Sequence, residues 1–250
     1  MSTPIVVFDF DGVICDSTAE CMVTSWNAWE RWNKRTGERT TVEEFSLAER
    51  EAYRPIRPLA RGAGEHYVLR RCLAEGLSLA GQGDYEEFCL TWSEDIRAYK
   101  DVFLRERDRF RKHALDDWIA LHVVFPSVRG AYRRLLDENR AYIATLKDGE
   151  SVRLILGAEG IKVPAARLLD QSQVDNKLDA LNEVVRLESC RKEDLLLIDD
   201  NVTHLVAPAA SGYPCLWTTW GNPPSDYFRI AKEQSIQCLS LEQLADVVNC

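Results

Sequence analysis

The sequence predicts an α/β fold: a doubly wound parallel sheet with an all-helical domain inserted after its first strand. Three observations favour this fold. Continuously apolar runs such as Ile5–Phe8 are too short for helices and lack polar alternation, as expected of strands buried on both faces of a parallel sheet. In the second half of the chain, such runs alternate with helical patterns. Between residues 17 and 121 there is no strand pattern.

Composition limits the class of protein. The 250-residue chain could form one large domain or two smaller ones, and its 46% apolar and 28% charged residues are typical of a soluble globular protein. The net charge of −9 argues against a nucleic-acid partner. No apolar run reaches the roughly 18 residues of a membrane span, and the N-terminus has no signal-peptide pattern. We therefore expect a cytoplasmic protein without a membrane partner, of unknown oligomeric state.

The cysteines fit the same compartment. They are scattered singly, without the CxxC pairs of zinc or redox sites. We interpret them as small buried side chains or incidental thiols in a reducing environment. The eight are Cys15, Cys21, Cys72, Cys89, Cys190, Cys215, Cys238 and Cys250.

The first predicted strand, Ile5–Phe8, is followed at once by Asp9, Asp11 and Gly12. Carboxylates at the carboxyl end of a parallel strand lie at the edge where open α/β sheets bind ligands. Asp and Gly together also form ordinary turns, so this motif alone leaves both interpretations open.

The region after this motif is predicted to be helical. Trp26, Trp29 and Trp32 recur at mostly helical spacing, which favours core packing. Helical patterns cover residues 17–34, 42–53, 65–75 and, with one or two breaks, 84–122. We expect residues 17–123 to form a separate helical domain.

A basic loop interrupts this helical region, where Arg54, Arg57 and Arg61 lead into Gly62 and Gly64. Backbone N–H groups and guanidinium groups in such a loop could bind an anion, so these residues are candidates for substrate binding. The same arginines could equally be solvated surface charges.

The pattern of the α/β core returns at Phe125-Pro126. A strand at 140–145 ends on Thr145, and the helix start at 148–151 offers unpaired N–H groups where a phosphoryl group could sit. Further strands are predicted at 168–170, from 195 onward and at 213–219. Helices are predicted at 127–139, 178–187, within 201–210, and at 225–233 and 241–248.

The strand pattern that begins at Leu195 ends on a second acidic pair, Asp199 and Asp200. If this strand neighbours the first, four carboxylates crowd one pocket. They cannot all stay ionised there without a cation or raised pKa values. Mg²⁺ suits such a site because it binds oxygen ligands, keeps several waters and meets substrate phosphates.

In chain order, these motifs resemble those of the haloacid dehalogenase (HAD) superfamily. The sequence DFDGV at 9–13 resembles its first motif and Asp199-Asp200 its fourth, while Thr145 and Lys177 stand in for the second and third. The resemblance covers about half of the chain. It implies a Rossmann-like core of residues 1–16 and 124–250 with strand order 5-4-1-2-3, and a helical cap domain in the first insertion position (C1) at 17–123.

The resemblance also implies a chemistry. Asp9 would attack phosphorus to form an aspartyl-phosphate, and Asp11 would protonate the leaving oxygen and later activate water. Thr145 and Lys177 would hold the oxygens of the transferring group. The cofactor would be Mg²⁺, bound by the Asp9 carboxylate, the Asp11 backbone carbonyl and Asp200, with Asp199 as a further ligand or as a partner of the bound waters.

The predicted function is therefore a Mg²⁺-dependent phosphohydrolase acting on a small phosphorylated metabolite. A phosphomutase of the β-phosphoglucomutase type and a catalytically idle HAD-like binding protein are the alternatives. Lys147 is a second candidate for the phosphate-binding lysine. His204 stands where the commonest fourth motif has a further acid, which leaves open whether Asp199 or Asp200 is the direct metal ligand.

Overall fold

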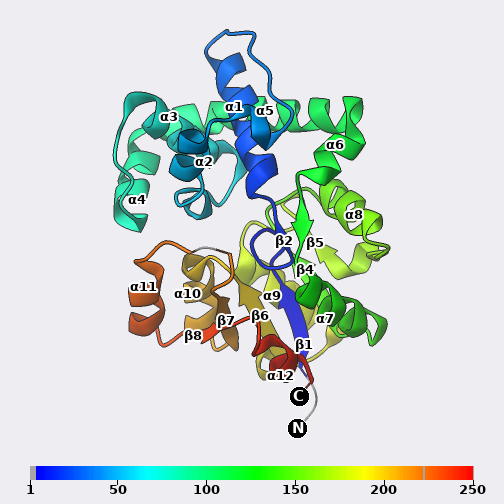
Figure 1. Ribbon diagram of the computed structural model, residues 1–250. Coiled ribbons are helices and arrows are strands. Elements are labelled where there is room, and N and C mark those ends of the chain that lie inside the picture. The colour runs from blue at the N-terminus through cyan, green and yellow to red at the C-terminus, as the bar shows by residue number, and fades with distance from the viewer. Residues whose placement is uncertain (1–3, 222, 250) are drawn as a thin grey trace. The chain divides into compact units, whose positions relative to one another are not determined.

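The computed structural model describes residues 4–221 and 223–249. The chain divides into two compact units (Figure 1). The α/β unit comprises Met1–Asp16, Val124–Pro223 and Tyr227–Cys250, and the helical unit comprises Ser17–Val123 and Pro224–Asp226.

The α/β unit is built on a parallel sheet in which β1 (Ile5–Phe8) is central. On one side β1 pairs with β4 (Ala141–Ala144), and β4 pairs with β5 (Leu168–Leu169). On the other side lie β6 (Leu195–Asp199), β7 (Cys215–Thr218) and β8 (Gln237–Leu239). The α/β class and the adjacency of the two acid-tipped strands are confirmed.

Numbered along the chain, the observed sheet order is 3-2-1-4-5-6, which is the expected order of five strands with a sixth strand added at one edge. The sequence analysis missed this strand, β8. Only three residues long, it has two exposed side chains, so it lacks the continuous buried run that marked the other strands. A separate two-stranded sheet joins β2 (Cys15–Asp16) and β3 (Val123–Val124).

Helices cover both faces of this sheet. Because crossovers between parallel strands are right-handed, α7 (Pro126–Asp137) and α8 (Gly149–Ala158) lie on one face. The opposite face carries α9 (Lys177–Glu188), α10 (Val202–Ala210) and α11 (Tyr227–Glu233). The last helix, α12 (Leu244–Asn249), packs beside α7 (Figure 1).

The helical unit contains no strand within residues 17–122, all of which are described. Its helices are α1 (Thr18–Trp32), α2 (Leu47–Tyr53), α3 (His66–Glu75), α4 (Gln82–Thr91), α5 (Ser93–His113) and α6 (Leu115–Ala120), with short 3₁₀ turns at Val42–Glu44, Arg57–Leu59 and Ala63–Glu65. The helix predicted over 42–53 is interrupted because Ser46 caps a new helix, accepting a hydrogen bond from the backbone of Glu49.

Aromatic side chains form the core of the helical unit. Tyr67, Tyr99 and Phe103 are buried together, and Trp29 and Trp32 pack against them. The predicted packing role is therefore confirmed for Trp29 and Trp32, whereas Trp26 lies outside this cluster and packs edge-on against Phe45.

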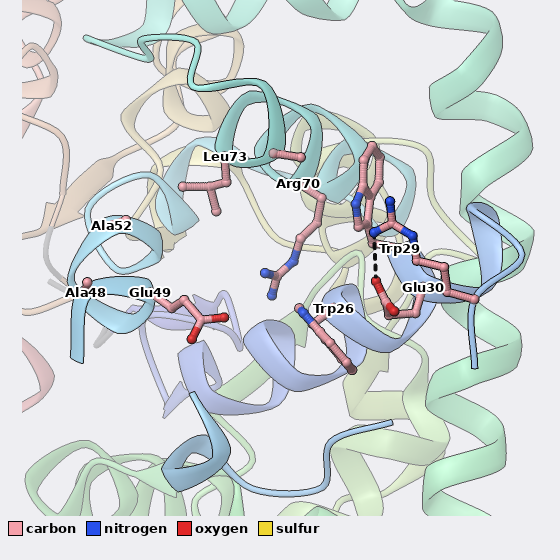
Figure 2. A pocket seen from close by; sticks show the side chains of 10 residues that line it. Trp26, Trp29, Glu30, Ala48, Glu49, Ala52, Arg70 and Leu73 are labelled. Atoms are coloured by element: carbon pink, nitrogen blue, oxygen red, sulfur yellow. Dashed lines mark hydrogen bonds and ion pairs between the residues drawn. The ribbon is translucent and has the colours of Figure 1, made fainter. Parts of the chain in front are cut away.

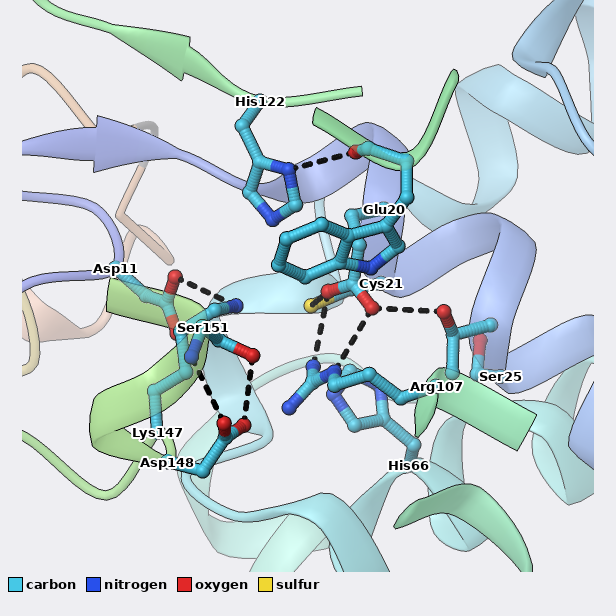
Figure 3. A network of polar contacts seen from close by, with 12 residues as sticks. Asp11, Glu20, Cys21, Ser25, His66, Arg107, His122, Lys147, Asp148 and Ser151 are labelled. Carbon is cyan, nitrogen blue, oxygen red and sulfur yellow. Dashed lines mark hydrogen bonds and ion pairs between the residues drawn. The ribbon is translucent and has the colours of Figure 1, made fainter. Parts of the chain in front are cut away.

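A buried ion pair ties α1 to α5 in the helical unit. Arg107 donates from Nε and Nη2 to the two carboxylate oxygens of Glu20, at 2.9 Å each (Figure 3). Glu20 is fully buried and also accepts a hydrogen bond from Thr24 at 2.7 Å. Because both charges are withdrawn from water, removal of either partner alone would leave the other charge buried without its counter-ion.

The cysteines are free thiols in the described part of the chain. Cys15, Cys21 and Cys72 are buried, whereas Cys238 is exposed. Cys250 lies outside the described residues. Among the helices of the described residues, none combines the length and the apolar character needed to cross a bilayer.

Candidate active site

Three acids converge at the carboxyl edge of the sheet. Phe8 and Ile198 are paired in register at the ends of β1 and β6, so Asp9 and Asp199 emerge side by side. Oxygen atoms of Asp9, Asp199 and Asp200 all lie within 4.8 Å of one another. Three carboxylates at this spacing fit a hard divalent cation such as Mg²⁺, which takes oxygen ligands.

Lys177 supplies positive charge to the same cluster. It opens α9, which Asn176 caps by accepting a hydrogen bond from the backbone of Asp179. The buried Lys177 Nζ lies 2.5 Å from Asp9 Oδ1 and 3.1 Å from Asp199 Oδ2, and it also donates to the backbone carbonyl of Ala144. One ammonium thus neutralises part of the charge of two buried acids.

The cluster shifts the pKa of each member. Burial raises the pKa of Asp9 to about 6, against the opposing effect of Lys177. Burial would also raise the pKa of Asp199, but Lys177 and His204 outweigh it and hold that pKa below its usual range. Burial lowers the pKa of Lys177, and the neighbouring Asp199 and Asp9 more than reverse this, so Lys177 stays charged.

Asp11 is paired with the other lysine that the sequence analysis considered. Its Oδ1 atom lies 3.3 Å from Nζ of Lys147, whose side chain is completely buried (Figure 3). Each lysine therefore contacts a different acid of the DFDGV motif: Lys177 contacts Asp9, and Lys147 contacts Asp11. Both candidate lysines therefore lie against acids of this motif.

Thr145 follows β4 directly and is buried beside the start of α8. Its hydroxyl accepts a hydrogen bond from the backbone N–H of Lys147 at 3.1 Å. At the helix start, Asp148 accepts from Ser151 N, and Gly149 N donates to Asp170 Oδ2 at 2.8 Å. Asp170 was not singled out from the sequence, although it ends the predicted strand at 168–170 and directly follows β5 in the structure.

Gly12 brings the DFDGV loop against Asp200. It has φ of +85°, and a Cβ atom at this position would lie 2.0 Å from Asp200 Oδ2. The backbone carbonyl of Asp200 accepts a hydrogen bond from Trp217 Nε1 at 2.8 Å. Glycine is therefore required at position 12 for two reasons. It can adopt the positive φ, and it leaves space for the side chain of Asp200, a candidate metal ligand.

We expect Gly12→Ala to displace the Asp200 carboxylate and weaken Mg²⁺ binding at least tenfold, a loss of about 1.4 kcal/mol or more of binding free energy. The left-handed backbone adds roughly 1–2 kcal/mol of lost stability. Gly212→Ala is the matched control, because Gly212 has φ of +87° and nothing within 4 Å of its added Cβ. Calorimetric titration with Mg²⁺ and thermal unfolding separate the two effects. Equal Mg²⁺ affinity in both variants would contradict the steric role of Gly12.

His204 occupies a position on α10 from which its Nδ1 lies 3.4 Å from Asp199 Oδ2. The backbone N–H of Asn201 donates to Asp199 Oδ1 at 2.8 Å. Asp199 is thus contacted by three groups, whereas Gly12 packs against Asp200.

The candidate substrate-binding residues belong to the helical unit, whereas the acid cluster belongs to the α/β unit. Arg61 pairs with Glu65 at 3.2 Å, and the backbone N–H of Gly62 also donates to Glu65. Gly64 is buried, and an added Cβ would lie 2.4 Å from the backbone oxygen of Ile96. Arg54 is exposed at the end of α2, and Arg57 donates to the carbonyl of Ala60.

Solved structures with the same fold were found by comparison with known proteins. No protein-family model matches the chain, and neither does any curated protein. Solved structures match over nearly its whole length. One from Lactobacillus delbrueckii, assigned as a phosphoglycolate phosphatase, has a TM-score of 0.68 at 17% identity and covers 99% of both chains. A hydrolase from Pseudomonas syringae has a TM-score of 0.62 at 13% identity and covers 98% of both.

A haloacid dehalogenase-like hydrolase from Bacteroides fragilis matches with a TM-score of 0.59 at 16% identity and covers 96% of both chains. At these identities the likeness concerns the backbone arrangement rather than individual side chains. The fold of this chain is that of the haloacid dehalogenase-like hydrolases.

Proposed function

We propose that the protein is a Mg²⁺-dependent phosphohydrolase that cleaves a small phosphorylated metabolite. The observation that carries this proposal is the convergence of Asp9, Asp199 and Asp200 around Lys177 at the carboxyl edge of the sheet. The names of similar structures, which include phosphoglycolate phosphatases, support a phosphate ester as the class of substrate.

In this proposal Asp9 is the nucleophile. Its carboxylate would attack phosphorus and displace the leaving oxygen to form an aspartyl-phosphate, which divides hydrolysis into two easier displacements. Asp11, two residues on, protonates the leaving oxygen and then accepts a proton from the attacking water. Lys147 orients Asp11 through their 3.3 Å contact. Thr145 and Lys177 bind the oxygens of the transferring group.

The residues that would hold Mg²⁺ are Asp9 and Asp200 through their carboxylates, Asp11 through its backbone carbonyl, and Asp199 directly or through water. Their oxygen-only donor set suits this ion. When bound, Mg²⁺ supplies positive charge that offsets the charge of the phosphoryl oxygens.

The helical unit, predicted at 17–123, serves in this proposal as a cap domain that selects the substrate. Arg54, Arg57, Arg61, Gly62 and Gly64 stay candidates for substrate binding. The internal Arg61–Glu65 ion pair reduces the charge that Arg61 can offer to an anion. The scattered free thiols favour the reducing cytoplasm as the compartment.

The test is release of phosphate from p-nitrophenyl phosphate and from a panel of phosphorylated metabolites that includes phosphoglycolate. We expect turnover with Mg²⁺, and a chelator should lower it at least about a hundredfold until Mg²⁺ is restored. Product analysis by NMR separates hydrolysis from isomerisation of a sugar phosphate. Binding of Mg²⁺ without turnover of any ester would contradict the proposal and favour an idle binding protein.

The two lysines give a matched pair of variants. Lys177→Met removes the ammonium that contacts Asp9, and we expect kcat to fall roughly 10²–10³-fold. Lys147→Met loses only the orientation of Asp11, so we expect a fall of about tenfold. Steady-state kinetics at saturating Mg²⁺ measures both effects. A larger loss in Lys147→Met than in Lys177→Met would reverse the roles given to the two lysines.

A further inference from the structure

A pocket of about 400 Å³ opens in the helical unit, lined by residues between 26 and 74 (Figure 2). Its walls come from α1, α2, α3 and the segment that follows α1, which contributes Arg35, so every lining residue belongs to the helical unit. Its volume is in the range of small-molecule sites. The lining residues are Trp26, Trp29, Glu30, Arg35, Ala48, Glu49, Ala52, Arg70, Leu73 and Ala74.

Arg70 on α3 places a fixed cation in this pocket. Its side chain is 93% buried, and Figure 2 shows the guanidinium lying between Glu49 and Trp26. Arg70 Nε donates to Ser25 Oγ at 2.9 Å, Nη2 donates to the backbone carbonyl of Met22, and the group lies 4.8 Å from the ring of Tyr53. These contacts orient the guanidinium but place no negative charge on it.

The acids of the pocket are already paired with other arginines. Glu49 lies 2.8 Å from Arg39, and Glu30 lies 3.4 Å from Arg35. Within residues 4–221 and 223–249, no carboxylate oxygen lies within 4.0 Å of the Arg70 guanidinium. Burial lowers the pKa of Arg70, as expected of a cation withdrawn from water without a partner ion. The pocket therefore contains a buried guanidinium that makes no ion pair within 4.0 Å, and Glu49 acts on it only at longer range.

The rest of the lining is apolar and partly aromatic. Trp26 and Trp29 contribute indole surface from α1, and Leu73 contributes aliphatic surface from α3. The alanines at 48, 52 and 74 leave space between the helices. Such walls favour a flat, apolar body about the size of one aromatic ring.

We propose that this pocket is a binding site for a small organic monocarboxylate with an apolar body, whose carboxylate pairs with Arg70. A guanidinium binds a carboxylate through two parallel hydrogen bonds, and Arg70 still has N–H groups to offer. Glu30 and Glu49 stand on the same walls, and because Coulomb repulsion grows with ligand charge, they disfavour a doubly charged phosphate or dicarboxylate more than a single carboxylate. The site is independent of the proposed phosphatase centre.

The test is calorimetric titration of the full-length chain with 3-phenylpropionate and with its neutral amide. We expect the carboxylate to bind and the amide to bind roughly ten- to a hundredfold more weakly, because a hydrogen bond to a charged group contributes about 1.5–3 kcal/mol. Arg70→Met should lose binding of the carboxylate to the same extent. Arg71→Met is the matched control, since Arg71 is the next residue but pairs with Glu75 and does not line the pocket.

Ala52→Phe tests the site without disturbing Arg70. Ala52 is exposed on α2 and lines the pocket, so a phenyl group there should occupy the space of the ligand and abolish binding while the unit stays folded. Equal affinity for acid and amide, unchanged binding in Ala52→Phe, or no heat with the carboxylate at millimolar concentration would each overturn the proposal.

Discussion

Asp9→Asn is expected to lower the rate of phosphate release roughly a thousandfold or more. Asparagine has nearly the same shape as aspartate but cannot act as a carboxylate nucleophile. The variant should remain folded, with a melting temperature equal to or above that of the unmodified chain. Burial raises the pKa of Asp9 from 3.8 to about 6, so at neutral pH the folded protein holds a carboxylate that the unfolded chain ionises more easily. The neutral amide of asparagine removes the free-energy cost of burying an ionised carboxylate.

The control for this variant is Asp137→Asn on the exposed end of α7, which should leave both the rate and the melting temperature unchanged. Phosphate release measured with the same substrate and Mg²⁺ concentration gives the comparison. A rate in Asp9→Asn within a factor of ten of the unmodified chain would remove Asp9 from the proposed mechanism.

Arg107→Met is expected to destabilise the helical unit by about 3–5 kcal/mol, because it leaves the fully buried Glu20 without its cation. Arg109→Met on the same helix is the control. Arg109 pairs with Glu38 and Glu106 at the surface, where such pairs contribute about 0–1 kcal/mol.

Tryptophan fluorescence during urea unfolding measures this effect, because five of the seven tryptophans lie within residues 17–123. The double variant Glu20→Leu with Arg107→Met should be more stable than Arg107→Met alone, since no unpaired charge remains buried. If Arg107→Met and Arg109→Met unfold at the same urea concentration, the buried ion pair does not stabilise the unit.

The elements that position the site could be predicted from the sequence because their signals are local. A short apolar run that ends on an acid marks both β1 and β6, and their adjacency followed from the parallel order of the sheet. The strand β8 gave no such signal, because Gln237 and Cys238 are exposed and only Leu239 is buried. Formation of an edge strand of three residues depends on its pairing with the neighbouring strand, here β7, more than on its own hydrophobic pattern.

Several contacts within the candidate site join residues that are far apart in the sequence. Gly12 could be seen as a turn residue, but its approach to Asp200 joins loops almost 190 residues apart in the chain and has no local pattern. The reach of Lys177 toward the carboxylates could be predicted from its distance of 22 residues before Asp199, and the structure confirms it. The contact of Lys147 with Asp11 could not, because residues 136 positions apart come together only in the folded chain.

The position of Lys177 between Asp9 and Asp199 bears on how the protein matures. A site made only of carboxylates would repel itself until an ion arrived, and the chain would then depend on cellular magnesium to finish folding. Here the chain carries its own counter-ion in a side chain 168 residues from the first acid. The three acids can therefore pack together during folding without a bound cation.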